Sequence, residues 1–408
     1  DRFIYLEEGE LVQVRSDDIS IFGTSDVSIA SRTVKLDSRD DASDKGNYKH
    51  FMLKEIHEQP KAVQSTLEGR LGQSSVLVES FGLGAETLLR EAKNIQIVAC
   101  GTSYYSGLVG RYWIEELAQL PCQVEIASEI RYRKAAVPES TVFVTISQSG
   151  ETADTLAALR QAKTQGYLGS LCICNVANSS LVRESDAAIM TNAGVEIGVA
   201  STKAFTTQLV DLLLLAVALG RSRGLSSDAE ANLVAALHSL PQRIEQVLEA
   251  EPAIRAVAEA FIEKDHSLFL GRGVHYPVAL EGALKLKEIS YIHAEGYPAG
   301  ELKHGPLALV DEDMPVVCIA PSDELLDKVK SNLQEVAARG GKLYVFTDHG
   351  AEFAGEEGLT TVTLPEVPPI LSPMVHVVPL QLLAYHVAVM RGTDVDQPRN
   401  LAKSVTVE

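Results

Sequence analysis

The stretch TVFVTISQSGETADTLAALRQAKTQG, from Thr141 to Gly166, joins a strand pattern directly to a helix pattern. An apolar, β-branched run ends abruptly in a polar turn, and an amphipathic helical pattern begins at once. In an open parallel sheet, ligands bind beyond the carboxyl ends of the strands, where such turns lead the chain into helices. The stretch therefore indicates an α/β fold and marks its turn as a candidate binding site.

The same alternation of strand and helix continues along the chain from about Glu91. Short β-branched runs such as IQIVAC, CQVEIA, TVFVTI and GSLCIC are separated by amphipathic segments. This alternation is typical of a parallel sheet that is covered by helices on both faces. We predict an α/β/α architecture.

The pattern also occurs twice. The stretch IQIVACGTSYYSGLVGRYWIEEL resembles HSLFLGRGVHYPVALEGALKLKEI, and TVFVTISQSGETADTL aligns with MPVVCIAPSDELLDKV. The offset is roughly 172 to 174 residues, which is the size of a domain rather than of a solenoid repeat. The sequence therefore predicts two similar domains, each a parallel sheet flanked by helices.

The two copies differ in the turn after the third core strand. Residues 147–150 read SQSG in the first copy, whereas residues 321–324 read PSDE in the second. Pro321 lacks a backbone donor and two carboxylates crowd the following helix start, which disfavours an anion there. We expect one anion-binding turn per chain.

Composition excludes several classes of partner. The formal charge is −19 and the isoelectric point is about 5.0, so we expect no nucleic-acid partner, because affinity for phosphate backbones comes mainly from clustered Lys and Arg. The most apolar stretch, Leu209–Gly220, is too short to span a bilayer and is interrupted by Asp211, so it predicts a buried helix and no membrane partner. Cys172 and Cys174 form no CxxC motif, and we interpret the cysteines as reduced, buried thiols of a cytoplasmic protein.

The first residues have a different texture. They predict two short strands around a turn at Glu8–Glu10 and further strand-like sequence to about Val34. The polar segment KLDSRDDASDKGNYKH predicts a linker, and a helical pattern then runs from near Tyr48 to a break at Pro60. The chain opens on Asp1 rather than Met, so we expect its natural N-terminus to be missing.

The turn at Thr141–Gly166 has the chemistry of a phosphate site. A helix N-terminus offers unpaired N–H groups and a partial positive charge, and Ser147, Ser149 and Thr152 add hydroxyl donors. An ordinary helix cap is the alternative explanation. Two further turns carry hydroxyls, at Thr102 and Ser103 in CGTSYYSG and at Ser201 and Thr202 in GVASTKAFTTQ, which suggests a polyol as well as a phosphate.

Ionisable side chains gather in the second copy. Glu281, Lys285 and Glu288 share one helix face, either as a solvated ion-pair stripe or as part of a site. The stretch HAEGYPAGELKHGP that follows predicts a loop, in which His304 is a better functional candidate than His293 at the helix end. Lys403 lies in a C-terminal tail, and such tails are usually frayed.

Six motifs in one order resemble a known family. CGTSYYSG, SQSGETADTL, GVASTKAFTTQ, ALKLKEISYIHAE, GELKHGPLALV and DVDQPRNLAKSVTVE resemble the sugar-phosphate isomerase half of the isomerizing glutamine:fructose-6-phosphate aminotransferases, which make glucosamine 6-phosphate. The resemblance implies two SIS (sugar isomerase) domains. It divides the chain into the end of an ammonia-releasing glutaminase domain plus linker (1–45), a first SIS domain with preceding helices (46–225), a second SIS domain (226–395) and a C-terminal lid (396–408).

The resemblance also implies roles for residues. Glu288 would move a proton between C1 and C2 of the sugar, assisted by Lys285, His304 would open the ring, and Lys403 would form a Schiff base with the open-chain ketose. The residues implied to bind the sugar phosphate are Thr102, Ser103, Ser147, Gln148, Ser149, Thr152, Val199, Ser201 and Ala402. It implies no metal and no cofactor, and a homodimer in which His304 is supplied across the interface.

Two rival functions remain. A SIS domain can act as a phosphosugar sensor, which has no need of Glu288, His304 and Lys403, and the chain has no basic DNA-binding segment. A dinucleotide-dependent oxidoreductase would rest on GRGVHY from Gly271, where the G-x-G-x-x-G pattern is incomplete. We therefore expect an enzyme that binds and isomerises fructose 6-phosphate.

Overall fold

The structure is a computed structural model of the 408-residue chain. It describes residues 2–4, 6, 9–16, 18–23, 33–35, 44–348, 353 and 358–407. The chain forms two compact units, Asp1–Gly46 and Asn47–Glu408.

The first unit contains two antiparallel strand pairs. β1 (Arg2–Ile4) pairs with β4 (Thr33–Lys35), and β2 (Leu11–Val14) pairs with β3 (Ile19–Phe22). Strands are present on both sides of Glu8–Glu10 as predicted, but they do not pair with each other. Two-stranded pairs of this kind bury little surface, and Leu11 and Val14 of β2 are exposed.

The helical segment before the first sheet is divided in two. α2 (Phe51–His57) ends at Glu58, and α3 (Gln59–Leu67) begins immediately after it. The predicted break therefore exists, but it lies at Glu58, two residues before Pro60. Pro60 is in the first turn of α3, where a helix leaves its N–H groups unpaired and proline is tolerated. Half of the predicted linker, residues 36–43, lies outside the described residues.

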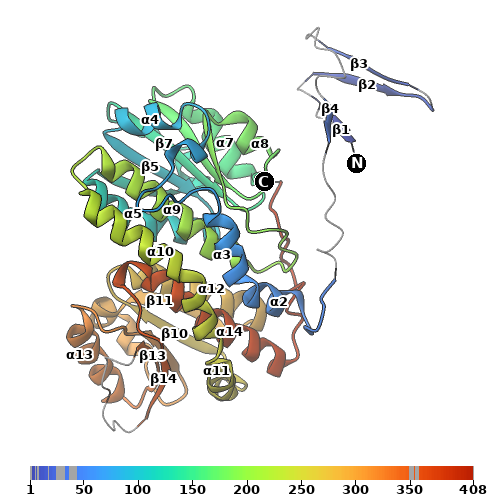
Figure 1. The fold of residues 1–408 in the computed structure, drawn as a ribbon. Helices are drawn as coiled ribbons and strands as arrows, with labels where there is room; N and C mark the ends of the chain where they lie inside the picture. Colours follow the sequence, from blue (N-terminus) through green and yellow to red (C-terminus); the bar gives the residue numbers. More distant parts are fainter. Residues whose placement is uncertain are drawn as a thin grey trace. The chain divides into compact units, whose positions relative to one another are not determined.

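The second unit holds two five-stranded parallel sheets of identical topology, which confirms the α/β class and the duplication (Figure 1). Their orders are β6-β5-β7-β8-β9 and β11-β10-β12-β13-β14. The strands of the first sheet are β5 (Asn94–Ala99), β6 (Cys122–Ile126), β7 (Thr141–Ser147), β8 (Gly169–Cys174) and β9 (Ala187–Met190). Those of the second are β10 (His266–Gly271), β11 (His293–Pro298), β12 (Pro315–Ile319), β13 (Lys342–Asp348) and β14 (Leu359–Leu364).

The middle strand β7 shows why the first sheet forms. It is buried at every position and lies between β5 and β8, in register with both. A strand covered on both faces needs a near-continuous apolar, β-branched run, and VFVTI supplies it. Because β7 ends at Ser147, the polar turn that follows lies at the carboxyl edge of the sheet.

One predicted loop is instead regular structure. Residues His293–Pro298 form β11, an edge strand parallel to β10, and Ala299–His304 form the short 3-10 helix η5. An edge strand tolerates the Gly and Pro that made this segment resemble a loop, because one side of its backbone has no strand to pair with.

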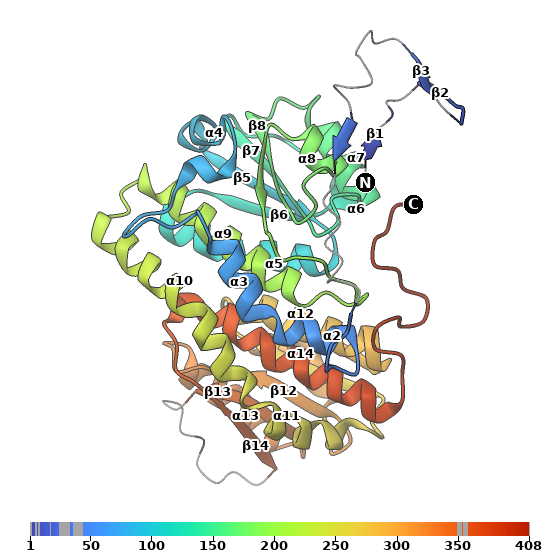
Figure 2. The same cartoon turned by 45° about the vertical axis from the view of Figure 1, so that its right-hand side comes forward.

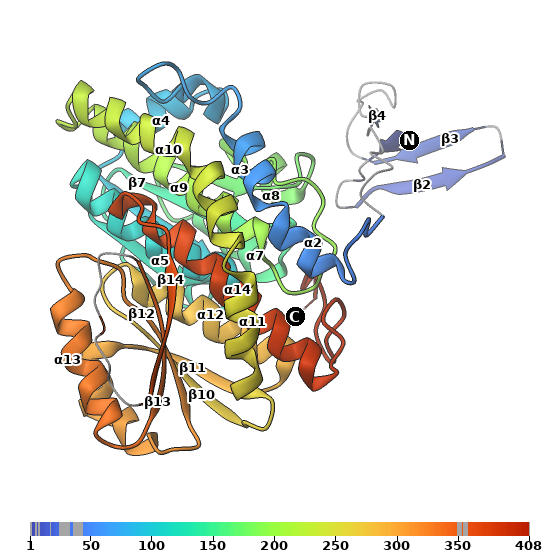
Figure 3. The same cartoon turned by 60° about the horizontal axis from the view of Figure 1, so that its bottom comes forward.

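Helices separate the two sheets and cover their outer faces. Four helices lie between the sheets, namely α5 (Gly101–Trp113), α9 (Lys203–Arg221), α12 (His275–Ser290) and α14 (Ser372–Arg391), with contacts from α5 to α9 and from α12 to both α5 and α14 (Figures 2 and 3). The outer face of the first sheet is covered by α7 (Ala153–Ala162) and that of the second by α13 (Leu326–Ala337).

The remaining helices are η2 (Val78–Phe81), α4 (Ala85–Glu91), η3 (Ile114–Ala118), α6 (Ala127–Ile130), α8 (Ser180–Glu184), α10 (Ser227–Leu248), α11 (Glu251–Ala258), η4 (Glu259–Phe261), η6 (Pro306–Leu309) and η7 (Pro369–Leu371).

Two helical stretches, Lys203–Arg221 and Pro369–Arg391, are long and apolar enough to cross a membrane by length and composition, and both are mostly or wholly buried inside the protein. They are core helices. The stretch predicted as a buried helix lies in the first of them, and its one acidic residue, Asp211, pairs with the buried Arg70.

Candidate active site

A cavity of about 300 Å³ lies at the carboxyl edge of the first sheet. It is formed by the turns after β5 and β7, the loop before α9, one face of α12 and the C-terminal tail. All the predicted site residues except His304 line it, together with Cys100, Gly101, Ile146, Leu401, Ser404 and Val405. Five stretches that are far apart in the sequence therefore meet in one place.

The turn after β7 is held in shape by its own hydroxyls. The Ser147 hydroxyl accepts a hydrogen bond from the Gly150 N–H at 3.0 Å and lies 3.1 Å from the Thr152 hydroxyl. Gly150 has a φ of +68°, and a Cβ at this position would lie 2.0 Å from the Ser179 hydroxyl oxygen. Only glycine fits here, because a side chain at this position would collide with Ser179.

Glu151 connects the turn to a neighbouring helix. Its carboxylate accepts the Ser180 N–H at 2.6 Å, at the start of α8. Glu151 therefore ties the turn to α8 and does not line the cavity.

Thr102 connects the first hydroxyl turn to α12. Its hydroxyl donates to Glu281 at 3.2 Å and accepts from the Lys285 amine at 3.1 Å. Ser103 is buried and accepts from the Gln208 amide of α9 at 3.0 Å. The turn is thus fixed by two helices, with the side chain of Thr102 between the cavity and a buried charge cluster.

That cluster overturns the solvated-stripe alternative for α12. The side chains of Glu281 and Lys285 are 0% and 1% exposed, and the Lys285 amine lies 3.4 Å from Glu281 and 2.6 Å from Glu288. Burial raises the pKa of Glu281 to about 8, against the opposing effect of Lys285. Burial lowers the pKa of Lys285, but Glu281 and Glu288 outweigh it and the net shift is upward. Glu288 is the member of the cluster that lines the cavity together with Lys285.

The C-terminal tail is attached along the cavity rather than frayed. The Ser404 hydroxyl lies 2.9 Å from that of Ser149, and the Val405 carbonyl accepts the Ala153 N–H at 3.0 Å. The Lys403 amine donates to Glu196 at 2.5 Å and to the Gly198 carbonyl at 2.8 Å. The tail therefore lies over the turn after β7.

His304 is not brought to this cavity by its own chain. It is the last residue of η5, it is exposed, and it does not line the cavity.

Sequence reasoning missed Glu196 and Cys100. Glu196 pairs with Lys403, and its signal was available, because it is the only charged residue between Asp186 and Lys203. Cys100 is half-buried and lines the cavity, whereas the other four cysteines are buried as predicted, and all five are free thiols.

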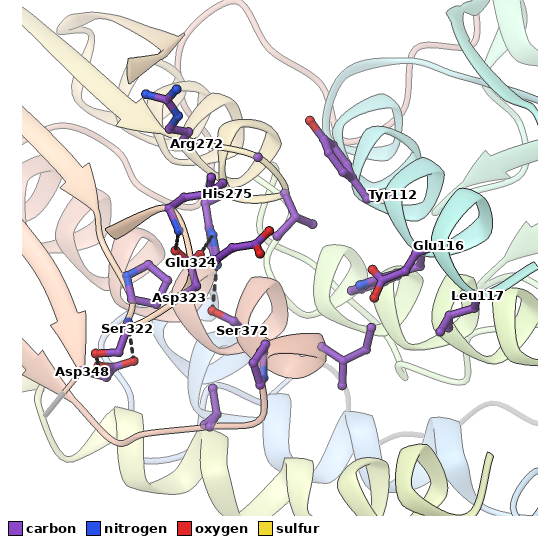
Figure 4. A pocket seen from close by; sticks show the side chains of 18 of the residues that line it. Tyr112, Glu116, Leu117, Arg272, His275, Ser322, Asp323, Glu324, Asp348 and Ser372 are labelled. Atoms are coloured by element: carbon purple, nitrogen blue, oxygen red, sulfur yellow. Dashed lines mark hydrogen bonds and ion pairs between the residues drawn. The ribbon is translucent and has the colours of Figure 1, made fainter. Parts of the chain in front are cut away.

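A second cavity, of about 860 Å³, lies at the corresponding edge of the second sheet (Figure 4). There the Ser322 N–H and hydroxyl both donate to Asp348, at 3.0 and 2.5 Å, and the Leu325 N–H donates to Asp323 at 2.8 Å. Carboxylates of the protein thus occupy the donors that an anion would need, in agreement with the expectation from the sequence.

Charge in the second cavity is also unfavourable for an anion. Burial and the neighbouring His376 lower the pKa of His275 to about 3, so this side chain is neutral. The carboxylates of Glu116, Asp323 and Glu324 line the cavity, and Figure 4 shows Glu116 on the opposite wall from Glu324. They outnumber the guanidinium of Arg272, which also lines the cavity and donates to Asn332 at 3.1 Å. Within the chain segments that the structure describes, no group of three or more His, Cys, Asp or Glu side chains could hold a metal ion.

Comparisons with known proteins agree with this geometry. The family model of the SIS domain matches residues 88–218 and 260–391. The chain therefore contains two SIS domains, and its fold and hydroxyl-lined cavity place it among proteins of the sugar-isomerase class.

The relatives are more specific. The chain is 62% identical over 409 residues to a glutamine–fructose-6-phosphate aminotransferase (isomerizing) of Pseudomonas aeruginosa and 58% identical over 407 residues to that of Escherichia coli K12, covering all of this chain and 67% of each relative. A solved C-terminal domain of glucosamine-fructose-6-phosphate aminotransferase from Francisella tularensis is 54% identical, with a TM-score of 0.86 over 87% of this chain and 100% of that chain.

The chain belongs to the family of isomerizing glutamine–fructose-6-phosphate aminotransferases. It corresponds to their isomerase half and is an enzyme.

Proposed function

We propose that the cavity of the first SIS domain binds fructose 6-phosphate, opens the ring and isomerises the ketose to the aldose. In the intact enzyme the same site would use ammonia released from glutamine to make glucosamine 6-phosphate. The observation that carries the proposal is the meeting, in one cavity, of hydroxyl donors, a carboxylate and two lysine amines from five separate stretches of sequence.

The phosphate would bind at the turn after β7. Ser147, Ser149 and Thr152 supply hydroxyls and Gln148 an amide, at the start of α7, where the helix dipole favours an anion. Ser103 would contact the same group. These neutral donors allow a protein of formal charge −19 to hold a dianion without a basic surface.

The sugar would lie between Thr102, Val199, Ser201 and Ala402, which line the same cavity. Glu288 would carry the proton between C1 and C2, because a carboxylate within reach of both carbons can act as base and then as acid. Lys285, 2.6 Å from Glu288, would hold that carboxylate in place and assist the proton transfer.

Lys403 would form the Schiff base with the open-chain ketose. Its amine is partly exposed and lines the cavity beside Ala402. Residues 396–408 would act as a lid, and the contacts from Ser404 and Val405 to the phosphate turn support this role, since closure over the substrate excludes water.

His304 would open the ring in the cavity of a second copy of the chain. Its exposure on η5 and its absence from the lining of its own cavity support a homodimer with shared sites.

The domain assignments given above for residues 1–45, 46–225, 226–395 and 396–408 are part of this proposal. So is a cytoplasmic location, supported by five free thiols, which a reducing compartment maintains.

The proposal is tested by incubating the purified chain with fructose 6-phosphate and following glucose 6-phosphate with a coupled dehydrogenase. We expect aldose to form, and we expect Lys403→Arg to lose most of the activity. A chain that binds the ketose tightly but never produces aldose would instead be a sensor.

A further inference from the structure

The amine of Lys403 is engaged by a carboxylate to which no role has been given so far. Glu196 lies in the loop before α9, its side chain is 0% exposed, and its Oε2 is 2.5 Å from the Lys403 Nζ. The carbonyl of Gly198 accepts a second hydrogen bond from the same amine at 2.8 Å. Both partners of Lys403 therefore come from one short loop.

The other oxygen of Glu196 is fixed by the start of α9. Its Oε1 accepts the N–H groups of Thr202 at 2.9 Å and Ala204 at 3.1 Å. Burial works against a charge at this place, but Lys403 and these two donors outweigh it, so the pKa of Glu196 lies below its ordinary value. Glu196 is thus an ionised carboxylate that cannot turn away from the amine without losing its backbone partners.

A second carboxyl group holds the loop from the opposite side. Glu55 of α2 accepts the N–H of Ile197 at 2.5 Å and that of Gly198 at 3.2 Å. Gly198 also accepts from Lys403, so Glu55 fixes the backbone of the same loop that contacts the amine. The tail is also fixed at its base, because the Val199 N–H donates to the Asp396 carbonyl at 3.0 Å.

We infer that Glu196 holds the Lys403 amine in place at the cavity wall and accepts a proton from it when the amine adds to the sugar. The inference rests on the proposed function. It adds to that function an acceptor for the proton of the Lys403 amine, because an ammonium ion has no lone pair and must lose a proton before it can attack the sugar.

One proton of the Lys403 ammonium group passes to the Glu196 carboxylate, and the nitrogen lone pair that this frees forms a bond to C2 of the open-chain ketose while the carbonyl π electrons move to oxygen. The two protons that remain on the nitrogen pass to that oxygen, which leaves as water, and the nitrogen lone pair then forms the imine double bond to C2. No oxidant, reductant or further reactant is consumed. Glu196 is suited to this because it already contacts the nitrogen that reacts.

The experiment compares wild type with Glu196→Gln and Glu196→Asp in the complete chain. The glutamine variant keeps an oxygen for Thr202 and Ala204 but has no charge, whereas the aspartate variant keeps the charge and shortens the reach by one carbon. Three quantities are measured: fructose 6-phosphate binding by calorimetry, KM and kcat of isomerisation, and the rate at which borohydride fixes the sugar on Lys403. Asp323→Asn is the matched control, since Asp323 accepts an N–H near the start of α13 in the second domain.

For Glu196→Gln we expect kcat and the fixation rate to fall by about 100-fold, the scale of a lost proton acceptor, while KM and the calorimetric affinity change by less than about threefold. Glu196→Asp should recover part of the loss, and Asp323→Asn should behave as wild type. A variant that loses only affinity would point to a structural role and contradict the inference.

Two outcomes separate the inference from the function on which it rests. If wild type fixes no sugar on Lys403, the Schiff-base proposal itself fails and the inference fails with it. If wild type fixes sugar and both Glu196 variants do so at the same rate, the inference alone is wrong. Should Glu196→Gln not fold, as judged by circular dichroism, Glu196→Asp decides, because wild-type kinetics in that variant would contradict a role for the geometry of the carboxylate.

Discussion

The hydroxyls of Ser149 and Ser404 lie 2.9 Å apart, although the two residues are separated by 255 positions in the sequence. This contact joins the proposed phosphate turn to the tail that carries Lys403. The proposed phosphate turn and the segment that carries the proposed nucleophile are therefore in direct contact.

The hydroxyls of the turn should contribute to binding rather than to chemistry. We expect Ser149→Ala and Thr152→Ala each to raise the KM for fructose 6-phosphate by about tenfold, the effect of roughly one hydrogen bond to a charged group, with kcat changed little. Steady-state isomerisation kinetics measure both constants. Ser322→Ala in the second domain is the control and should leave KM unchanged, because Ser322 is bound to Asp348. If all three substitutions raised KM equally, the turns after β7 and β12 would not differ in their contribution to substrate binding.

Gly150→Ala should damage the turn more than its backbone conformation alone explains. Gly150 and Gly166 both have positive φ, +68° and +80°, but a Cβ at Gly150 would meet Ser179 at 2.0 Å whereas one at Gly166 has nothing within 4 Å. We expect Gly166→Ala to cost about 1 kcal/mol in free energy of unfolding and to retain binding. Gly150→Ala should cost more and abolish binding. Urea denaturation measures the free energy of unfolding, and calorimetry measures the binding of fructose 6-phosphate. Equal values for the two variants would contradict the geometry of the turn.

The buried carboxyl of Glu281 should make the free energy of unfolding depend on pH, with a sign that follows from its raised pKa. Its pKa is raised from 4.5 to about 8, chiefly by burial, so the folded protein binds this proton more tightly than the unfolded chain does. The resulting stability is fully present below about pH 4.5 and is lost as the pH rises through about 8. Glu281→Gln mimics the protonated form. It should match wild type near pH 5 and exceed it at pH 9 by an amount on the order of a few kcal/mol, because one pKa unit is about 1.4 kcal/mol.

The measurement is the free energy of unfolding of both proteins at pH 5, 7 and 9. Glu184→Gln serves as the control with the opposite sign, since hydrogen bonding to Arg160 lowers the pKa of Glu184. Its difference from wild type should stay constant over this range. A constant difference for Glu281→Gln as well would show that Glu281 does not titrate between the two states.

Shared sites in a dimer should appear as complementation. His304→Ala and Lys403→Arg should each be nearly inactive, but a mixed dimer has one site with His304 from one chain and Lys403 from the other. After unfolding and joint refolding, statistical mixing should restore about a quarter of wild-type activity, because half of the dimers are mixed and each has one intact site. No recovery, with dimers verified by sedimentation, would place His304 in its own chain's reaction or outside the reaction.

The fold could be predicted from the sequence where apolar residues recur with the period of a strand or a helix, and where a polar turn separates two such segments. The run that became β7 and the turn after it were predictable because burial on both faces demands an apolar strand, and the same holds for the second copy at β12. The hydroxyl residues were found because their turns follow predicted strands. The resemblance to a family supplied the roles of Glu288, His304 and Lys403, which no periodicity could give.

Pairing and burial were not predictable from local pattern. Glu281 and Lys285 have the spacing of a solvated ion pair, and only the packing of α12 against α5 and α14 buries them. β11 was mistaken for a loop, since an edge strand lacks the apolar run of a central one. Glu196 stands out in the sequence as an isolated charge, but its partner Lys403 is 207 residues away and only the fold brings the two side chains together.

The most direct test of the proposed Schiff base is to add borohydride to the chain with fructose 6-phosphate and to locate the attached sugar by peptide mapping. We expect one hexitol phosphate per active site, bound to Lys403, and none in Lys403→Arg. Sugar bound to Lys285 or to any other lysine, or the absence of an adduct while isomerisation proceeds, would contradict it.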